Sequence, residues 1–197
     1  MSNTYLNRLV SLMPPHGGAG DSGDWTAVEA GWGKAFPSDY KKFISIYGMG
    51  DIEDCIAILC PDELLPYEAP KPGMFEETEN ARGILEEFGT SGASIESPAE
   101  IIAWGGDPVA DMLCWLCRGD NPDEWPTLVW NRGRDEWVVY ECGMVEFLFK
   151  VLSAEFDECP LGITDAWGCD SPSFVHWRLQ RARQLAGLDP WTGAPIE

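Results

Sequence analysis

The chain has 197 residues, of which 45% are hydrophobic and 10 are tryptophans. This apolar content supports one sizeable core, so we expect one main domain with an extension. The 33 acidic and 13 basic residues give a formal charge of -20, which repels phosphate backbones and anionic lipids and excludes nucleic acid and membrane surfaces as expected partners. The same charge either attracts a basic protein partner or only keeps the chain soluble.

Apolar residues recur at helical spacing over residues 4–13, directly before Pro14 and Pro15, and predict a short amphipathic helix. This first segment lacks the continuous apolar run of a secretory signal, and nowhere do about 18 apolar residues in a row predict a membrane span. The seven cysteines are an odd number without a disulfide framework. We therefore expect a cytoplasmic protein with reduced thiols.

Two helices and a strand are predicted next. Asp24 is a typical N-cap for a short second helix. Pro37 fits a first helical position, and the apolar spacing that follows it predicts a third helix that ends at Gly48. Residues 52–60 are rich in apolar side chains and predict one strand.

The negative charge is concentrated in residues 51–100, which contain 13 acidic residues and only two basic ones. Within this region, residues 74–88 place apolar side chains at helical spacing and glutamates on the remaining surface, which predicts a helix with an acidic outer face. We consider six carboxylates as candidates for contact with a basic partner: Glu53, Asp54, Glu76, Glu77, Glu86 and Glu87. The alternative for each is a solvated surface carboxylate.

Four short apolar segments predict strands at residues 101–104, 112–117, 128–131 and 137–141. Gly133 lies in the turn before the last of them, where we expect positive φ. A closing amphipathic helix follows at 144–152. Because no long helical crossover separates the strands, we predict an α+β fold in which helices flank an antiparallel meander sheet.

Residues 156–197 are a predicted C-terminal extension. Ser171 and Pro172 fit an N-cap and a first helical position, so we predict a helix over residues 172–186. This helix is the basic element of the chain, with Arg178, Arg181 and Arg183. We expect it to dock on the protein's own acidic surface, and a role in dimer contact is the alternative.

No catalytic, metal or cofactor site is predicted. Cys114 and Cys117 form a single CxxC in a strand, where alternation sends the two sulfurs to opposite faces. His16 and His176 stand outside any recognisable nucleophile motif. The chain also lacks a glycine-rich phosphate loop.

Three carboxylates lie close together in the segment RGDNPDEWP, namely Asp120, Asp123 and Glu124. A pair of carboxylates can act as general acid and base, so an unrecognised hydrolase is one hypothesis. A proline-containing Asx turn explains the same residues without catalysis, and we favour that interpretation.

Two blocks of the sequence are similar to a known family. The first block is FPSDYKKFISIYGMG, and the second is AWGGDPVADMLCWLCRGDNPDEWPTLVW followed by EWVVYECGMVEFLFKVL. In order and spacing they resemble the SUKH superfamily over most of residues 25–152. One departure is Ala110, where the family usually has glycine before the aspartate that aligns with Asp111, and this leaves open a different turn geometry.

The resemblance implies a SUKH-like domain over residues 1–155, with its core at residues 24–152. Bacterial members of the family are best known as immunity proteins of polymorphic toxin systems, and fungal members include regulators of cell-wall assembly. The resemblance therefore implies a protein that is not an enzyme, has no cofactor, and binds and neutralises a cognate toxin, for example a nuclease. A regulatory or scaffold module that binds an endogenous protein is the alternative.

Overall fold

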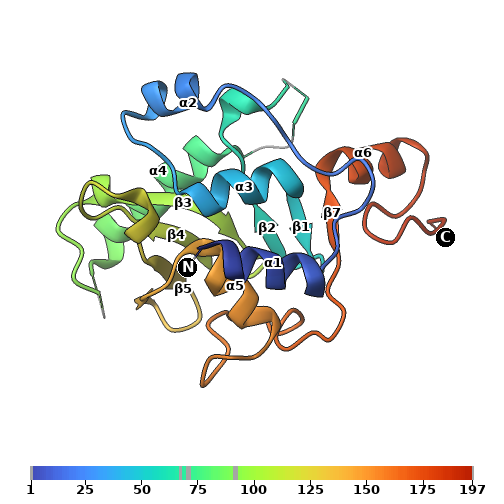
Figure 1. Ribbon diagram of the computed structural model, residues 1–197. Coiled ribbons are helices and arrows are strands. Elements are labelled where there is room, and N and C mark those ends of the chain that lie inside the picture. Colours follow the sequence, from blue (N-terminus) through green and yellow to red (C-terminus); the bar gives the residue numbers. More distant parts are fainter. Residues whose placement is uncertain (1, 67, 70–71, 91–92, 197) are drawn as a thin grey trace.

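The computed structural model describes residues 2–66, 68–69, 72–90 and 93–196. Within this part of the chain, seven strands form one open antiparallel sheet accompanied by six α-helices, which confirms the predicted α+β meander (Figure 1). The strands are β1 (Gly50–Ile52), β2 (Ile56–Ile58), β3 (Ile101–Gly106), β4 (Met112–Leu116), β5 (Thr127–Asn131), β6 (Glu136–Tyr140) and β7 (Phe174–His176). The helices are α1 (Ser2–Leu12), α2 (Trp25–Trp32), α3 (Ser38–Ile46), α4 (Met74–Phe88), α5 (Met144–Leu152) and α6 (Trp177–Leu185).

The sheet has the strand order β6-β5-β4-β3-β2-β1-β7. Six strands therefore follow one another as a meander, and the C-terminal extension adds β7 at the β1 edge. No helix in the described ranges is long and apolar enough to cross a lipid bilayer.

Helices α1, α3 and α5 pack together over one face of the sheet (Figure 1). Trp115 of β4 points to this face, and its ring centroid lies 4.8 Å from that of Tyr40 on α3. Trp104 of β3 lies 6.1 Å from Phe147 on α5. All four side chains are fully buried, so this face is a continuous aromatic core.

Two aspartates fix the starts of the helices on this face. The backbone N–H of Ser38, at the start of α3, donates to Asp123 at 2.5 Å, and the N–H of Val145, in the first turn of α5, donates to Asp39 at 3.4 Å. First-turn N–H groups have no carbonyl partner within their own helix, so these carboxylates satisfy them. Gly48, at which we predicted the end of this helix, follows α3 at φ 76°, in the left-handed conformation that glycine often adopts after a helix.

The predicted single strand over residues 52–60 is wrong, because the chain folds there into a hairpin of β1 and β2. Glu53 and Asp54 form its turn with φ values of 52° and 53°. Two successive residues at positive φ make a tight turn whose twist matches the flanking strands. Aspartate adopts this conformation more readily than most residues, but glutamate in it gives no sequence signal.

The predicted helix over residues 172–186 is corrected at its start. Phe174 and Val175 pair with Ile52 and Asp51 of β1, and the helix α6 begins only at Trp177. Ser171 and Pro172 suit a helix start, but pairing with an open sheet edge decides the conformation of the next residues. Such tertiary contacts override local capping preferences.

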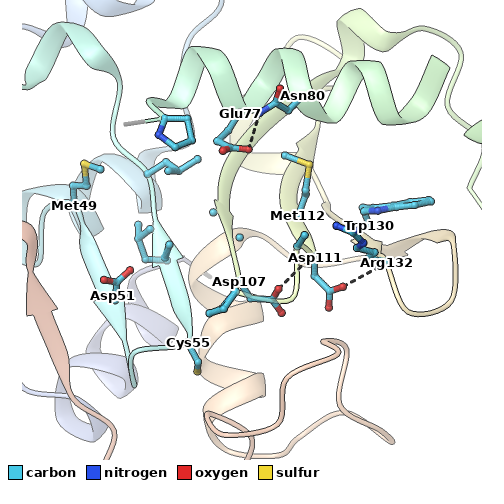
Figure 2. Close-up of a pocket in the computed structure, with 18 of the residues that line it drawn as sticks. Met49, Asp51, Cys55, Glu77, Asn80, Asp107, Asp111, Met112, Trp130 and Arg132 are labelled. Carbon is cyan, nitrogen blue, oxygen red and sulfur yellow. Dashed lines mark hydrogen bonds between the residues drawn. The ribbon is translucent and has the colours of Figure 1, made fainter. Parts of the chain in front are cut away.

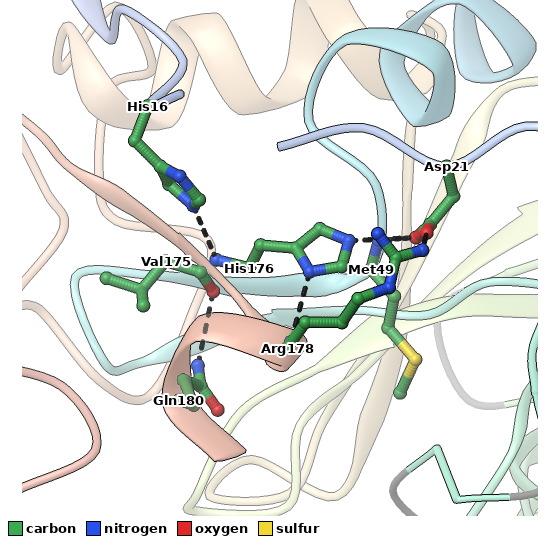
Figure 3. Close-up of polar contacts among 7 residues, drawn as sticks. All are labelled: His16, Asp21, Met49, Val175, His176, Arg178 and Gln180. Atoms are coloured by element: carbon green, nitrogen blue, oxygen red, sulfur yellow. Dashed lines mark hydrogen bonds and ion pairs between the residues drawn. The ribbon is translucent and has the colours of Figure 1, made fainter. Parts of the chain in front are cut away.

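The extension is held to the N-terminal segment by a cluster that we call the Asp21 clasp: Asp21, Met49, His176 and Arg178 (Figure 3). The Asp21 carboxylate is buried, forms an ion pair with Arg178, accepts the Met49 N–H at 2.9 Å and lies 3.1 Å from Nε2 of His176. The Arg178 N–H donates to Nδ1 of His176, so the imidazole proton must reside on Nε2, where it can be donated to Asp21. His16 accepts the His176 N–H at 3.1 Å and adds a second link.

Contacts of two arginines hold the basic helix α6 near its start and near its end. Arg178 pairs with the buried Asp21, which lies outside the acidic region of residues 51–100. Docking of the helix on the protein's acidic surface therefore stays a prediction. Arg183 instead donates to the carbonyls of Pro190 and Trp191. The histidines that we placed outside any catalytic motif are structural partners of the extension.

One turn differs from the expected geometry, and another retains the usual one despite a changed residue. In the β5–β6 hairpin the residue at positive φ is Asp135, at 50°, and not Gly133. In the β3–β4 connection Ala110 has φ 68°. Ala110 therefore keeps the left-handed conformation for which a glycine is normally used, and the side chain makes that conformation costly.

Candidate functional site

A groove with a volume of about 910 Å³ opens on the face of the sheet opposite α5 (Figure 2). Helix α4 runs along one side of it, and strands from β1 to β5 contribute to its floor and walls. Trp177 and Gln180 of the C-terminal extension complete the lining next to β1. A volume of this size is typical of binding sites in proteins.

The groove is hollow because small residues occupy the middle of the floor. One row of directly opposed residues crosses the whole sheet from β6 to β7, and directly opposed residues point to the same face. The row consists of Trp137, Trp130, Met112, Gly106, Ala57, Asp51 and Val175. Large side chains at Met112 and Trp130 thus stand beside Gly106 and Ala57, where almost nothing fills the space.

One stripe of α4 forms the long wall of the groove. Glu77, Asn80, Ile84 and Phe88 line it, and their spacing of three or four residues places them on one side of the helix. The opposite stripe, with Met74, Thr78, Ala81 and Leu85, is buried in the protein. Phe88 is 49% exposed and its ring lies 5.4 Å from that of Trp130, so the groove has an accessible aromatic end.

Carboxylates surround this apolar floor. Asp51, Asp54, Glu77, Asp107, Asp111 and Asp135 line the groove, whereas Arg132 is the single basic residue among the described lining residues. In Figure 2, Asp51, Glu77 and Asp107 stand on three different sides of the open space. The groove therefore combines apolar contact area with a strongly negative field.

Asp107 is held in an unfavourable environment for a charged group. Its Oδ1 accepts the N–H groups of Val109 at 3.0 Å and Asp111 at 2.9 Å, but its Oδ2 is buried without a partner in the described part of the chain. Burial, followed by the negative charge of Asp111, raises the pKa of Asp107 to about 6.

Asp51 has a similar environment at the floor. Its carboxylate accepts a hydrogen bond from Nε2 of Gln180 at 2.5 Å. Burial raises the pKa of Asp51, the hydrogen bond from Gln180 opposes this effect, and the charge of Asp54 adds to it. Both groups would gain from a nearby cation, because an opposite charge favours the ionised carboxylate.

The Asp111 carboxylate stabilises the fold around the groove. It is 1% exposed and accepts the N–H of Arg132 at 2.9 Å and the N–H of Gly162 at 2.5 Å. Its carboxylate thereby joins the β5–β6 turn and the start of the extension to the rim of the groove. Two backbone donors satisfy it, so it does not depend on a ligand.

The described lining residues include no serine, threonine, tyrosine or lysine. Cys55 is the groove cysteine, and burial raises its pKa to about 12, so its thiol stays protonated and unreactive at neutral pH. Neither histidine lines the groove, and no group of three potential metal ligands occurs among the described residues. The arrangement is suited to binding a segment that carries both apolar and cationic side chains.

Of the six carboxylates that the sequence nominates, the structure brings two into the groove, Asp54 and Glu77. Glu53 is engaged internally and accepts hydrogen bonds from N and Oγ of Ser173 at 2.5 and 2.8 Å. Glu76 lies at a separate depression beside Asp62. Glu86 and Glu87 are exposed on α4 outside the groove lining.

Asp51 and Asp107 line the groove but are not among the residues that the sequence nominates. The available signal was the pair Gly105 and Gly106 at the end of an apolar strand, since glycine within a strand often marks a close approach or an open surface. The position of Asp51 opposite Ala57 depends on the β1–β2 hairpin, which the sequence did not predict.

The other residues that we considered for catalysis or metal binding have structural roles. Asp123 accepts from the start of α3, and Asn121 binds the N–H of Asp123 and the carboxylate of Glu124, as in the Asx turn that we favoured. Cys114 and Cys117 are buried free cysteines. Alternation along β4 places Cys114 beside Met112 on the groove face of the sheet.

Comparison with known proteins gives one match. The family model described as SMI1 / KNR4 family (SUKH-1) matches residues 20–150. This range contains most of the groove, but it ends before the extension that carries Trp177 and Gln180. No curated protein and no solved structure matches the chain.

Proposed function

Because the chain belongs to the SMI1/KNR4 family (SUKH-1), we propose that it is a non-enzymatic immunity protein that binds and neutralises a cognate toxin domain. The observation that carries this proposal is the groove, which has an apolar floor, six lining carboxylates and a single lining base in the described chain. Its partner is a protein that presents a basic, partly apolar segment. Binding of such a segment blocks the partner stoichiometrically and needs no catalysis.

The charge of the whole chain supports a basic partner. A formal charge of -20 steers cationic proteins toward the surface and speeds their association, to about 10⁸ M⁻¹s⁻¹ or more at low salt. A toxin that acts on nucleic acid fits this chemistry, since its active site must attract phosphate and is therefore basic. The groove carboxylates would then occupy positions that phosphates occupy in the substrate.

The encounter that we propose takes place in the cytoplasm. All seven cysteines are free, and five of them are buried. A reducing compartment is the usual location of proteins that keep this many thiols.

The test is co-expression of this protein with the product of the adjacent reading frame, with cell survival as the readout. We expect survival only when both are present, and a one-to-one complex that weakens between low and moderate salt. Toxicity without rescue contradicts the immunity function. A stable complex with a housekeeping protein instead supports the alternative from the same family, a regulatory or scaffold module of the Smi/Knr type.

A further inference from the structure

Asp51 occupies a position in the groove where a ligand and the extension meet. It lies in the cross-strand row between Ala57 of β2 and Val175 of β7, and Gln180 of α6 covers its carboxylate. Met49 and Trp177 line the groove near the same strand edge. A carboxylate with apolar neighbours suits a long cationic side chain, whose aliphatic stem packs while its charged end pairs.

The Gln180 amide that covers the Asp51 carboxylate carries no charge. Gln180 donates one hydrogen bond to Asp51, and its Nε2 also lies 3.2 Å from the carbonyl oxygen of Val175. No lysine or arginine of the described chain forms an ion pair with Asp51, although Asp21, on the far side of β7, has one with Arg178. A neutral amide only partly compensates the negative charge of the half-buried carboxylate, whereas a guanidinium or ammonium group adds Coulombic attraction to the hydrogen bond.

Trp177, which lines the groove near Asp51, has a polar group without a partner in the described chain. Trp177 is 5% exposed, and its indole N–H is buried without an acceptor in the described ranges. The described lining residues thus include one buried donor without an acceptor, the indole N–H of Trp177, and one buried acceptor without a donor, Oδ2 of Asp107. Four other tryptophans of the described chain, Trp104, Trp115, Trp125 and Trp137, also have buried indole N–H groups without an acceptor and do not line the groove. The unpartnered N–H of Trp177 therefore does not mark the site by itself, and the subsite is inferred from Asp51 and its neutral partner.

We propose that Asp51 is the receptor for one guanidinium or ammonium group of the partner, and that this cation displaces the Gln180 amide from the carboxylate. The proposal deepens the proposed function, because it names the part of a partner that the groove takes. It also assigns a role to the C-terminal extension, which lies outside the family match: α6 covers the subsite when no partner is bound.

The test uses a blocked pentapeptide with a central arginine between alanines and leucines, and a second peptide with neutral citrulline in place of arginine. Both are titrated into the isotope-labelled protein at low salt and followed by NMR. We expect Asp51→Asn to weaken binding of the arginine peptide at least tenfold. The matched control Asp157→Asn removes the same charge from an exposed site outside the groove lining, and should change the affinity less than twofold.

Two further comparisons test the geometry. Citrulline should bind the natural protein as weakly as arginine binds Asp51→Asn, and the side-chain amide signal of Gln180 should shift only with the arginine peptide. Gln180→Ala should leave the affinity unchanged or increase it, because the cation no longer has to displace the amide. A weaker affinity in Gln180→Ala contradicts displacement.

Equal losses in Asp51→Asn and Asp157→Asn would show that only the overall field attracts the cation and would overturn the subsite. Absence of binding by the arginine peptide at millimolar concentration would overturn it as well. The immunity function fails independently of this result: rescue by Asp51→Asn as complete as by the natural protein refutes the subsite alone, whereas peptide binding at Asp51 without any rescue refutes the immunity function alone.

Discussion

Two carboxylates on opposite sides of β7 show how the same chemical group can serve the fold or serve a partner. Asp21 and Asp51 both receive a side chain from the extension. Asp21 is buried, whereas Asp51 is half-buried at the groove. Asp21 binds a cation, an imidazole N–H and a backbone N–H. Asp51 receives only the neutral amide of Gln180.

The pKa values of the two groups move in opposite directions for this reason. Burial alone would raise the pKa of Asp21, but the hydrogen bonds from His176 and Met49 and the charge of Arg178 outweigh it and lower the pKa. Burial raises the pKa of Asp51, and the single hydrogen bond does not compensate. The charge of Asp21 is thus balanced within the chain, whereas Asp51 and Asp107, on different sides of the groove, have no cationic partner in the described chain.

The largest expected effect comes from breaking the Asp21 clasp. Asp21→Ala removes the ion pair and leaves the buried Met49 N–H and the His176 ring without their acceptor. Two unmet buried donors and a lost charge pair should lower the free energy of unfolding by about 3 kcal/mol. Urea denaturation measures this change, and hydrogen exchange should show faster opening of β7 than of β4.

The control for the clasp is Glu155→Ala, which removes a surface ion pair with Arg8. Both partners of that pair are partly exposed, so the loss should stay below about 1 kcal/mol. Similar losses in the two variants would mean that the clasp contributes no more than a surface ion pair.

The second prediction fills the groove without touching a charge. Ala57→Phe places a large side chain at the hollow centre of the floor, between Gly106 and Asp51 in the cross-strand row. Phenylalanine suits a strand and meets open space, so stability should change by less than about 1 kcal/mol. Partner binding should weaken at least tenfold, as measured by pull-down and by survival in co-expression.

A matched control for this variant is Ala30→Phe on the exposed side of α2. It adds the same side chain outside the groove lining, and rescue should be complete. Loss of rescue in Ala30→Phe but not in Ala57→Phe would place the partner on another surface.

The fold was predictable where local pattern and tertiary environment agree. The helix at Met74–Phe88 and the helix at Met144–Leu152 have the predicted ends, because an apolar stripe and capping glycines act in the same direction. The start of α6 and the β1–β2 hairpin were not predictable in this way. Val175 is a strand residue because it pairs with Asp51, and Asp51 pairs in turn with Ala57 of β2.

The candidate site was predictable in its charge and not in its shape. The acidic region from Asp51 to Glu100 does contribute Asp51, Asp54 and Glu77 to the groove. Three further carboxylates of the lining, Asp107, Asp111 and Asp135, come from later turns that only the folded sheet brings near. The hollow itself depends on which small residues oppose one another, and that register is a property of long-range pairing.

The third prediction sharpens the difference in pKa. The pKa of Asp107 in the fold, about 6, lies above its ordinary value, so the folded state binds the proton more tightly than the unfolded chain. The contribution of Asp107 to stability therefore falls as the pH rises from about 4 to about 6 and is constant above that range. Asp107→Asn removes this penalty and should stabilise the protein by about 1 kcal/mol at pH 7, allowing for its partial exposure.

Urea denaturation of Asp107→Asn and the natural protein from pH 4 to pH 7.5 measures the effect. The two should be equally stable near pH 4 and diverge toward pH 6. Asp157→Asn serves as the control and should run parallel to the natural protein over the whole range. A constant difference at every pH would mean that the asparagine acts through packing and that Asp107 titrates normally.

The smallest expected effect concerns the turn that carries Asp107 and Asp111. Ala110 holds φ 68° in this turn, where a side chain costs about 1–2 kcal/mol that glycine does not incur. Part of that gain is offset because glycine makes the unfolded chain more flexible, so Ala110→Gly should stabilise the protein by about 0.5 kcal/mol.

Ala154→Gly, at φ 50°, should likewise stabilise the protein. Ala27→Gly in the exposed part of α2 should instead destabilise by about 1 kcal/mol. If thermal unfolding shows that Ala110→Gly behaves like Ala27→Gly, the turn is not strained, and the glycine usual in the family serves some purpose other than backbone conformation.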